Sequence, residues 1–168
     1  MIRLSTYAEL IAQAELVREY AKECSLPEIG EVQPNGEIYA AMERIGVAQV
    51  FAAYSRPLAS IGVGCESQDA DSVDDNSVDQ MIGFAAILMP VMPHYSKRVA
   101  TVESIFVTES QRKSGIGKDL MRTIEDYAKE KGCAAILYSA PAGGKFERVL
   151  DASKHYRRSN SVFVGNLD

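Results

Sequence analysis

The sequence has no apolar run long enough to cross a lipid bilayer. Its longest apolar run, Ile82–Val91, is interrupted by Gly83 and Pro90, whereas a membrane-spanning helix needs about 20 apolar residues. The N-terminus also lacks the charged and then apolar pattern of a secretory signal peptide. We therefore expect a cytoplasmic protein without a membrane partner.

Cysteine and histidine are scarce, which argues against disulfides and metals. Cys24, Cys65 and Cys133 are odd in number, widely spaced and without a C-x-x-C pair. The two histidines, His94 and His155, have no cluster of cysteines or carboxylates near them at the spacing of metal ligands. The sequence therefore predicts plain thiols and no metal.

The chain also lacks an excess of basic residues. Its 18 Lys and Arg against 23 Asp and Glu leave a net charge of -5 and a pI near 5.1. Nucleic-acid binding depends on a basic surface that releases counterions, so DNA and RNA are not expected partners. With 168 residues, 46% of them hydrophobic, the chain has the size of one domain, and we expect residues 1–168 to form one.

Acidic residues gather in one stretch, at about residues 56–80, which contains few large apolar side chains. The acids, with no basic residue among them, are Glu66, Asp69, Asp71, Asp74, Asp75 and Asp79. We interpret this acidic stretch as a loop or insertion. Its charge either attracts a cationic substrate or partner, or belongs to a solvated loop and aids solubility.

Hydrophobic periodicity predicts a chain that mixes helices and strands. Apolar residues at helical spacing predict helices at residues 6–23, 38–45, 115–131 and 145–158. Segments rich in β-forming residues predict strands at 47–54, 81–89, 99–107, 133–139 and 161–164. Thr6 and Glu9 have the spacing of a capping box, and Gly132 is placed to end the third helix in a left-handed conformation.

The order of these elements predicts two larger units. Strands 81–89 and 99–107, separated by the turn-like segment 93–98, predict a β-hairpin. Strand 99–107, helix 115–131 and the apolar strand 133–139 predict a strand–helix–strand unit with parallel, buried strands and a right-handed crossover. Such a unit is a scaffold for a ligand site.

The loop that leads into helix 115–131 has the chemistry of a phosphate site. A helix N-terminus offers unpaired N–H groups and a partial positive charge, and glycines let a ligand approach the main chain. The loop is not a P-loop, because Arg112 and Asp119 stand where a glycine and a hydroxyl residue are required. It is not a dinucleotide fingerprint either, because Leu120 replaces the third glycine.

The remaining pattern, R-x-x-G-x-G, is formed by Arg112, Gly115 and Gly117 and resembles the pyrophosphate-binding loop of the GNAT N-acetyltransferases. The resemblance extends over residues 81–164. It implies the GNAT fold, an α/β (α+β) architecture with a central mixed, mostly antiparallel sheet, a V-shaped splay between two parallel central strands, and flanking helices. It also implies an acyltransferase that transfers an acetyl group from acetyl-CoA, its cosubstrate, to a primary amine by direct attack.

The same resemblance implies where acetyl-CoA binds. The pantetheine arm pairs with the backbone of the strand before the loop, at Ile105, Phe106 and Val107. The loop residues implied for the pyrophosphate are Arg112, Lys113, Ser114, Gly115, Ile116, Gly117 and Lys118. The alternative for both segments is an ordinary buried strand followed by a tight loop.

Two residues are candidates for proton transfer. Glu103 is the only carboxylate in strand 99–107, and because an attacking ammonium must lose a proton, it is the candidate general base. A solvent-facing or salt-bridged glutamate is the alternative. Tyr156 aligns with the tyrosine that often protonates the departing CoA thiolate in the family. After Tyr156 the chain departs from the family pattern, because Asn160 and Ser161 replace the usual glycine and aromatic residue.

Two other functions are compatible with these residues. A catalytically weak acyl-CoA-binding regulatory module would keep the loop without turnover, and a protein-interaction scaffold would use the acidic stretch to engage a basic partner. No motif identifies the amine-bearing acceptor, which is a small molecule or a protein. The chain ends shortly after Val164, so a homodimer that completes the last pair of strands is a further expectation.

Overall fold

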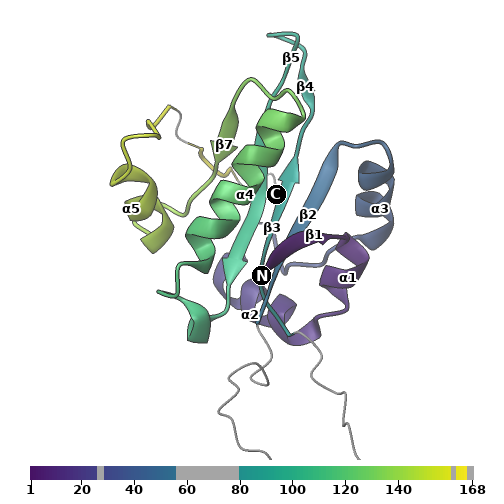
Figure 1. The fold of residues 1–168 in the computed structure, drawn as a ribbon, viewed down its shortest axis with the longest axis vertical. Coiled ribbons are helices and arrows are strands. Elements are labelled where there is room, and N and C mark those ends of the chain that lie inside the picture. The colour runs from purple at the N-terminus through teal and green to yellow at the C-terminus, as the bar shows by residue number, and fades with distance from the viewer. Residues whose placement is uncertain (26–28, 56–79, 160–161, 166–168) are drawn as a thin grey trace, which may run out of the picture.

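A five-stranded sheet forms the centre of the protein, whose computed structural model describes residues 1–25, 29–55, 80–159 and 162–165. The strand order is β1-β2-β3-β6-β7, and only the β6–β7 pair is parallel (Figure 1). The strands are β1 (Ile2–Ser5), β2 (Ala48–Tyr54), β3 (Met81–Leu88), β6 (Ala100–Val107) and β7 (Ile136–Tyr138). This mixed, mostly antiparallel sheet confirms the predicted architecture. The predicted acidic stretch, apart from Gln80, lies outside the described residues.

Helices cover both faces of the sheet (Figure 1). They are α1 (Tyr7–Ile11), α2 (Ala14–Cys24), α3 (Gly36–Arg44), α4 (Ile116–Glu130) and α5 (Lys145–Asp151). An apolar cluster packs on each face of the sheet. One cluster contains Leu120 and Ile124 of α4, and the other contains Leu10 of α1 and Leu16 of α2. Within the described ranges, no helix combines the length and the apolar composition needed to span a bilayer.

The helix predicted at residues 6–23 is in fact two helices. Its capping box is confirmed, because Thr6 Oγ1 accepts the N–H of Glu9 at 3.1 Å and Glu9 Oε2 accepts the N–H of Thr6 at 3.3 Å. The helix then ends in a tight turn, in which the N–H of Gln13 bonds to the carbonyl of Leu10 at 3.0 Å. Gln13 leaves the helical conformation, with φ of -86° and ψ of 69°, and α2 begins after it.

The predicted β-hairpin is confirmed by the antiparallel pair β3 and β6. Gly83 lies opposite Val107 at one end of the pair, and Leu88 lies opposite Thr101 at the other. The turn-like segment between them includes a small second sheet of β4 (Val91–Met92) and β5 (Lys97–Arg98). This extension projects beyond the five-stranded sheet (Figure 1).

The predicted strand–helix–strand unit is confirmed by the parallel pair β6 and β7, in which Ala100 lies opposite Ile136. Gly132, after the end of α4, has the predicted left-handed conformation, with φ of +73°. The prediction of a long buried strand at 133–139 is wrong in extent, because β7 has only three residues and Leu137 is 43% exposed. β7 lies at the edge of the described sheet, so no described strand pairs with its outer side.

Two predictions near the C-terminus are also wrong in part. The helix predicted at 145–158 ends at Asp151. The strand predicted at 161–164 does not form at the described residues 162–164, where Phe163 is 90% exposed; Ser161 lies outside the described residues. A strand needs a neighbour for its backbone hydrogen bonds, so β-propensity alone does not create one.

Candidate functional site

A β-bulge interrupts β6 at Glu103. The consecutive β3 residues Ala86 and Ile87 pair with Ser104 and Val102, so Glu103 is an extra residue without a partner on β3. Side chains normally alternate between the faces of a strand, but here Glu103 and Ser104 line the same pocket. The bulge therefore presents a carboxylate and a hydroxyl side by side on the face covered by α1, α2 and α3.

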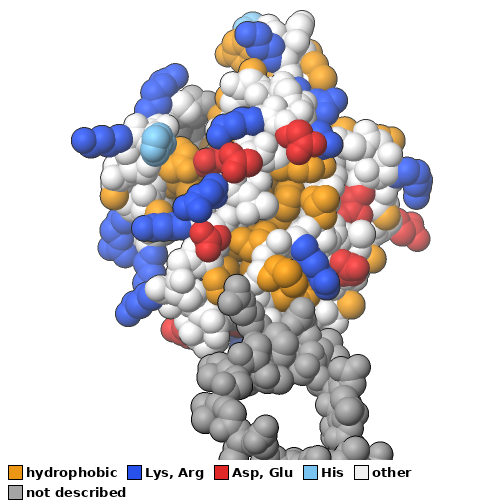
Figure 2. Space-filling model, viewed as in Figure 1, with side chains coloured by type: hydrophobic (Ala, Val, Ile, Leu, Met, Phe, Trp, Pro, Cys, Tyr) orange, Lys and Arg blue, Asp and Glu red, His pale blue; other side chains and the backbone are white. Residues whose placement is uncertain are grey.

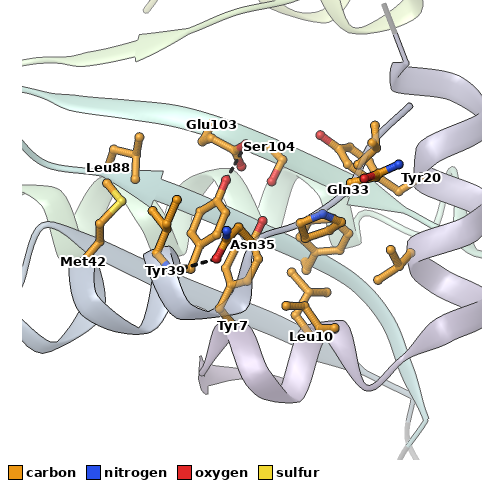
Figure 3. Close-up of a pocket in the computed structure, with 16 residues that line it drawn as sticks. Tyr7, Leu10, Tyr20, Gln33, Asn35, Tyr39, Met42, Leu88, Glu103 and Ser104 are labelled. Carbon is orange, nitrogen blue, oxygen red and sulfur yellow. Dashed lines mark hydrogen bonds between the residues drawn. The ribbon is translucent and has the colours of Figure 1, made fainter. Parts of the chain in front are cut away.

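A pocket of about 360 Å³ lies between these helices and the sheet (Figure 3). Its walls are Tyr7, Leu10, Ile11, Val17, Tyr20, Val32, Gln33, Pro34, Asn35, Ile38, Tyr39, Met42, Phe84, Leu88, Glu103 and Ser104. Among these described residues, Glu103 is the one with a formal charge, and most of the others are apolar or aromatic. The pocket is thus an apolar cavity with one carboxylate.

Tyr39 orients the Glu103 carboxylate. Its hydroxyl donates a 2.9 Å hydrogen bond to Glu103 Oε1 (Figure 3). The ring of Tyr39 stacks on the ring of Tyr7, with centroids 3.4 Å apart and planes inclined by 6°. The N–H of Tyr7 in turn donates to Glu43 Oε1 at 2.8 Å, which ties α1 to α3. The carboxylate is therefore held by a phenol that is itself fixed between two helices.

The charge of Glu103 acts on three phenols around the pocket. Burial is the main cause that raises the pKa of Tyr7, Tyr20 and Tyr39. The negative charge of Glu103 raises the pKa of each of them further. All three phenols are consequently neutral hydrogen-bonding groups at pH 7, and the pocket carries a net negative field that favours a cation.

The strands β6 and β7 separate next to this pocket. They pair only where Ala100–Val102 lies opposite Ile136–Tyr138, and no described strand continues the pairing beyond Val102 on that side of β6. The N–H of Thr108 bonds to the carbonyl of Ile82 on β3 at 3.0 Å. Along an antiparallel strand, the N–H and C=O groups of successive residues point alternately toward one neighbouring strand and toward the other. Because Thr108 bonds to β3, the main-chain groups of Val107 and Ile105 point away from β3 and into the splay.

Phe106 has a different position from its two neighbours. The same alternation directs its main-chain groups toward Phe84 on β3, with which it is paired. Its side chain lies on the pocket face and packs in the apolar cluster of α1 and α2. Of the three residues that the resemblance assigned to pantetheine, Ile105 therefore has both main-chain groups open to a ligand, and Val107 has its N–H open, because its carbonyl accepts from Arg112 Nε.

The loop before α4 has the geometry of an anion site. Gly115 precedes the helix with φ of +93°, a left-handed conformation that suits glycine, and Lys113 has φ of +76°. The first N–H of the helix ladder to be satisfied is that of Asp119, bonded to the carbonyl of Gly115 at 3.1 Å. The N–H groups of Gly117 and Lys118 belong to the first turn and have no partner within the helix. They can therefore donate to a phosphate.

Arg112 is tied to the end of β6 and to α2. Its Nε donates to the carbonyl of Val107 at 3.0 Å, and its Nη2 forms a 2.7 Å ion pair with Glu23. The guanidinium also lies over the ring of Phe106, 5.3 Å from the centroid. The resemblance assigned Arg112 to the pyrophosphate, whereas these contacts fix the path of the loop. The exposed side chains of Lys113 and Lys118 are the cations nearest the open N–H groups in sequence.

Tyr156 lies in a separate cluster beside α4. Its hydroxyl donates to Glu125 Oε1 at 2.5 Å, and the hydroxyl of Tyr138 donates to the same oxygen at 2.9 Å. Burial, and then the Glu125 carboxylate, raise the pKa of Tyr156 to about 12. Tyr156 therefore carries its proton at neutral pH and can donate a hydrogen bond once it turns away from Glu125.

The cysteines in the described part of the chain have no sign of activation. Burial raises the pKa of both Cys24 and Cys133, so both are thiols at neutral pH. Cys65 lies outside the described residues. Among the residues that the structure describes, no group of three His, Cys, Asp or Glu side chains is placed to hold a metal ion.

Basic side chains are distributed unevenly over the surface. Figure 2 shows Lys and Arg side chains gathered on the side of the molecule where α5 lies, and the exposed residues there include Lys145, Arg148, Lys154 and Arg157. The described walls of the pocket contain neither lysine nor arginine. An ammonium group in the pocket would therefore meet no like charge from those walls.

Sequence reasoning selected Glu103 as a candidate base but missed the aromatic residues beside it. Tyr7 lies three residues before Leu10 in α1, and Tyr20 lies three residues after Val17 in α2; this helical spacing from apolar residues was the available signal. Nothing local in the sequence connects Tyr39 with Glu103, because 64 positions separate the two residues.

Comparisons with known proteins find acetyltransferases, both by sequence family and by fold. Residues 65–143 match the family model described as the acetyltransferase (GNAT) family. The fold is similar to that of an aminoglycoside acetyltransferase from an uncultured soil metagenomic sample, solved in complex with sisomicin, with a TM-score of 0.66, 14% identity, and coverage of 100% of this chain and 96% of that one. No curated protein sequence matches the chain.

Two further structures have the same fold. A ribosomal-protein-alanine N-acetyltransferase from Brucella melitensis biovar Abortus 2308 has a TM-score of 0.60 and 20% identity, with coverage of 98% of this chain and 99% of that one. An acetyltransferase from Trypanosoma brucei has a TM-score of 0.58 and 15% identity, with the same coverage of both chains.

Proposed function

This chain is an acyltransferase of the GNAT family, and from that premise we propose that it transfers the acetyl group of acetyl-CoA to a primary amine by direct attack. The observation that carries the proposal is the bulge at Glu103, which places a carboxylate in a pocket beside the splay of β6 and β7. An acceptor site and a cosubstrate site thereby meet at one point of β6. We also propose that residues 1–168 act as a single domain, which agrees with the 96% and 99% coverage of the compared acetyltransferase chains.

The residues around the splay fit acetyl-CoA. The N–H and carbonyl of Ile105 and the N–H of Val107 match the amides of a pantetheine arm, and the N–H groups of Gly117 and Lys118 match a pyrophosphate. A Cβ on Gly117 would meet only Val107 Cγ2, at 3.9 Å, so the space over this glycine is open to a ligand. When bound, acetyl-CoA supplies an activated thioester carbonyl.

Glu103 acts as the general base in this proposal. An amine enters as an ammonium ion, and the Glu103 carboxylate accepts its proton, so that the nitrogen lone pair is free to form the new C–N bond. The hydroxyl of Tyr39 keeps the accepting carboxylate in place. The C–S bond then breaks, the CoA thiolate departs, and the attacking nitrogen releases its second proton to water to become the amide. Cys24 and Cys133 are neutral thiols, which agrees with a reaction that needs no acyl-enzyme.

Tyr156 is the proposed partner of the departing thiolate. A thiol has an ordinary pKa of about 8.5, well below the value of about 12 for Tyr156, so complete proton transfer from the phenol is uphill. Tyr156 therefore stabilises the thiolate by donating a hydrogen bond. Replacing it by phenylalanine (Tyr156→Phe) is expected to lower kcat by about 10- to 100-fold with little change in KM, because a hydrogen bond to a charged group contributes about 1.5–3 kcal/mol.

Steady-state kinetics on Tyr156→Phe and on the matched variant Tyr138→Phe test this role. Both variants remove one of the two hydroxyls bonded to Glu125, so a purely structural role predicts equal effects. A kcat that falls only in Tyr156→Phe supports the thiolate role. An unchanged kcat in both variants would contradict it.

A thiol-release assay with acetyl-CoA and a panel of primary amines tests the function itself. Amine-dependent release of CoA, together with an acetylated amine detected by mass spectrometry, is the expected result. Calorimetric binding of acetyl-CoA without release for any amine would instead identify an acyl-CoA-binding regulatory module. Absence of binding would leave the protein-interaction scaffold.

A further inference from the structure

The pocket beside Glu103 has the composition of a site for one cation on an apolar body. Glu103 is the single charged group among its described walls, and no second carboxylate lies there. An ammonium buried without a partner loses several kcal/mol of solvation that nothing repays. A substrate with several ammonium groups would therefore find a carboxylate for only one of them among the described walls.

Tyr7, Tyr20, Tyr39 and Phe84 add aromatic rings to the walls of the pocket. The stacked pair of Tyr7 and Tyr39 lies next to the carboxylate, and Tyr20 packs edge-on against Phe84 and Phe106 at 5.3 and 5.8 Å. Ring faces attract an ammonium and also pack against an apolar substituent. In Figure 3 the ring of Tyr39 lies between Glu103 and the ring of Tyr7, so charge and aromatic surface are presented together.

The size of the pocket limits the substrate further. Its volume of about 360 Å³ lies at the lower end of the range of roughly 300–1,000 Å³ that small-molecule sites occupy. Leu10 and Phe84, which are 3% and 2% exposed, form part of its apolar walls. This volume accommodates one ring or a short alkyl chain with its amine.

We propose that the acceptor is a small primary amine with a single positive charge and an apolar, aryl-sized body. This inference rests on the proposed acetyl transfer and names its substrate class. The ammonium lies at Glu103 and Tyr39, and the apolar body packs against Tyr7 and Tyr20. Selectivity against polyamines and aminoglycosides then arises because the described walls offer no second carboxylate to their further ammonium groups.

Kinetics with matched probes test the substrate class. Phenethylamine has one ammonium and a ring, whereas spermidine has several ammonium groups and no ring. We expect kcat/KM for phenethylamine to exceed that for spermidine by at least about 100-fold, which corresponds to about 2.7 kcal/mol. Equal values, or a preference for spermidine, would overturn the proposed class.

A designed variant pair tests the reason for the selectivity. Met42 lies on α3 at the Leu88 end of the pocket (Figure 3) and is only partly buried, so a glutamate fits there. Met42→Glu supplies a second carboxylate, and Met42→Gln is its uncharged control of similar shape. We expect Met42→Glu to reduce the preference for phenethylamine over spermidine at least about tenfold, and Met42→Gln to leave it within about threefold. Equal effects of the two variants would contradict the charge argument.

Calorimetric titration of phenethylamine into the protein separates this inference from acetyl transfer. Binding that Glu103→Gln weakens at least about tenfold, without thiol release, would retain the amine site and overturn the enzymatic function. Efficient release with spermidine but not with phenethylamine would retain the enzyme and overturn the substrate class. Neither binding nor release with phenethylamine would overturn both.

Discussion

Replacing Glu103 by glutamine (Glu103→Gln) is expected to lower kcat by about 10²–10⁴-fold, the usual contribution of a general base. Glutamine keeps the shape of the side chain and can still accept the hydrogen bond from Tyr39, but it cannot accept the proton of an ammonium. The Glu103 side chain is exposed to solvent at the pocket and carries no core packing, so the fold should be unaffected. The measurement is the steady-state rate of thiol release at saturating acetyl-CoA and amine.

The matched control is Glu37→Gln, which removes an exposed carboxylate in the first turn of α3. It changes the protein charge by the same amount and does not touch the pocket, so its kcat should stay within about twofold of the unmodified protein. Acetyl-CoA affinity should be unchanged in both variants. A kcat for Glu103→Gln within about threefold of the control would assign Glu103 to orientation of the acceptor rather than to proton transfer.

Replacing Gly117 by leucine (Gly117→Leu) is expected to weaken acetyl-CoA binding by about 100-fold without lowering stability. The added side chain occupies the space over the first turn of α4, where a phosphate must approach the N–H groups of Gly117 and Lys118. Loss of one or two charge-assisted hydrogen bonds, at about 1.5–3 kcal/mol each, corresponds to this change in Kd. Leucine also has a higher helix propensity than glycine by up to about 1 kcal/mol.

Gly132→Ala is the control with the opposite expected behaviour. Gly132 has a φ of +73°, so alanine there is strained and should lower the free energy of unfolding by about 1 kcal/mol. It lies at the other end of α4 from the loop, so Kd for acetyl-CoA should not change. Calorimetry and denaturant unfolding on both variants check the pair. If Gly117→Leu retains acetyl-CoA affinity, the loop is an ordinary tight turn.

Several features of the fold could be predicted because they depend on neighbouring residues. The capping box of Thr6 and Glu9, the left-handed Gly132 and the loop around Gly115 are each set by short spacings in the sequence. The hairpin of β3 and β6 and its parallel partner β7 followed from the order of apolar segments. Such local signals survive into the folded protein because tertiary packing does not oppose them.

The errors have a common cause in contacts between distant segments. β1 has only four residues and forms by pairing with β2, where Ile2 lies opposite Ala53, so its own composition was too weak a signal. The strand predicted at 161–164 has suitable residues but no partner at its described positions. Strand formation requires that a neighbour be present, which propensity does not encode.

The sequence by itself determined the chemistry that was available: a glycine-containing loop before a helix, and one carboxylate, Glu103, in an apolar strand. Tertiary structure decided where that carboxylate points and what surrounds it. The bulge at Glu103 arises from the register between β3 and β6, and the rings of Tyr7 and Tyr39 reach it only because α1 and α3 pack on the same face. Register and helix docking depend on contacts between residues far apart in the chain, and these exist only after folding.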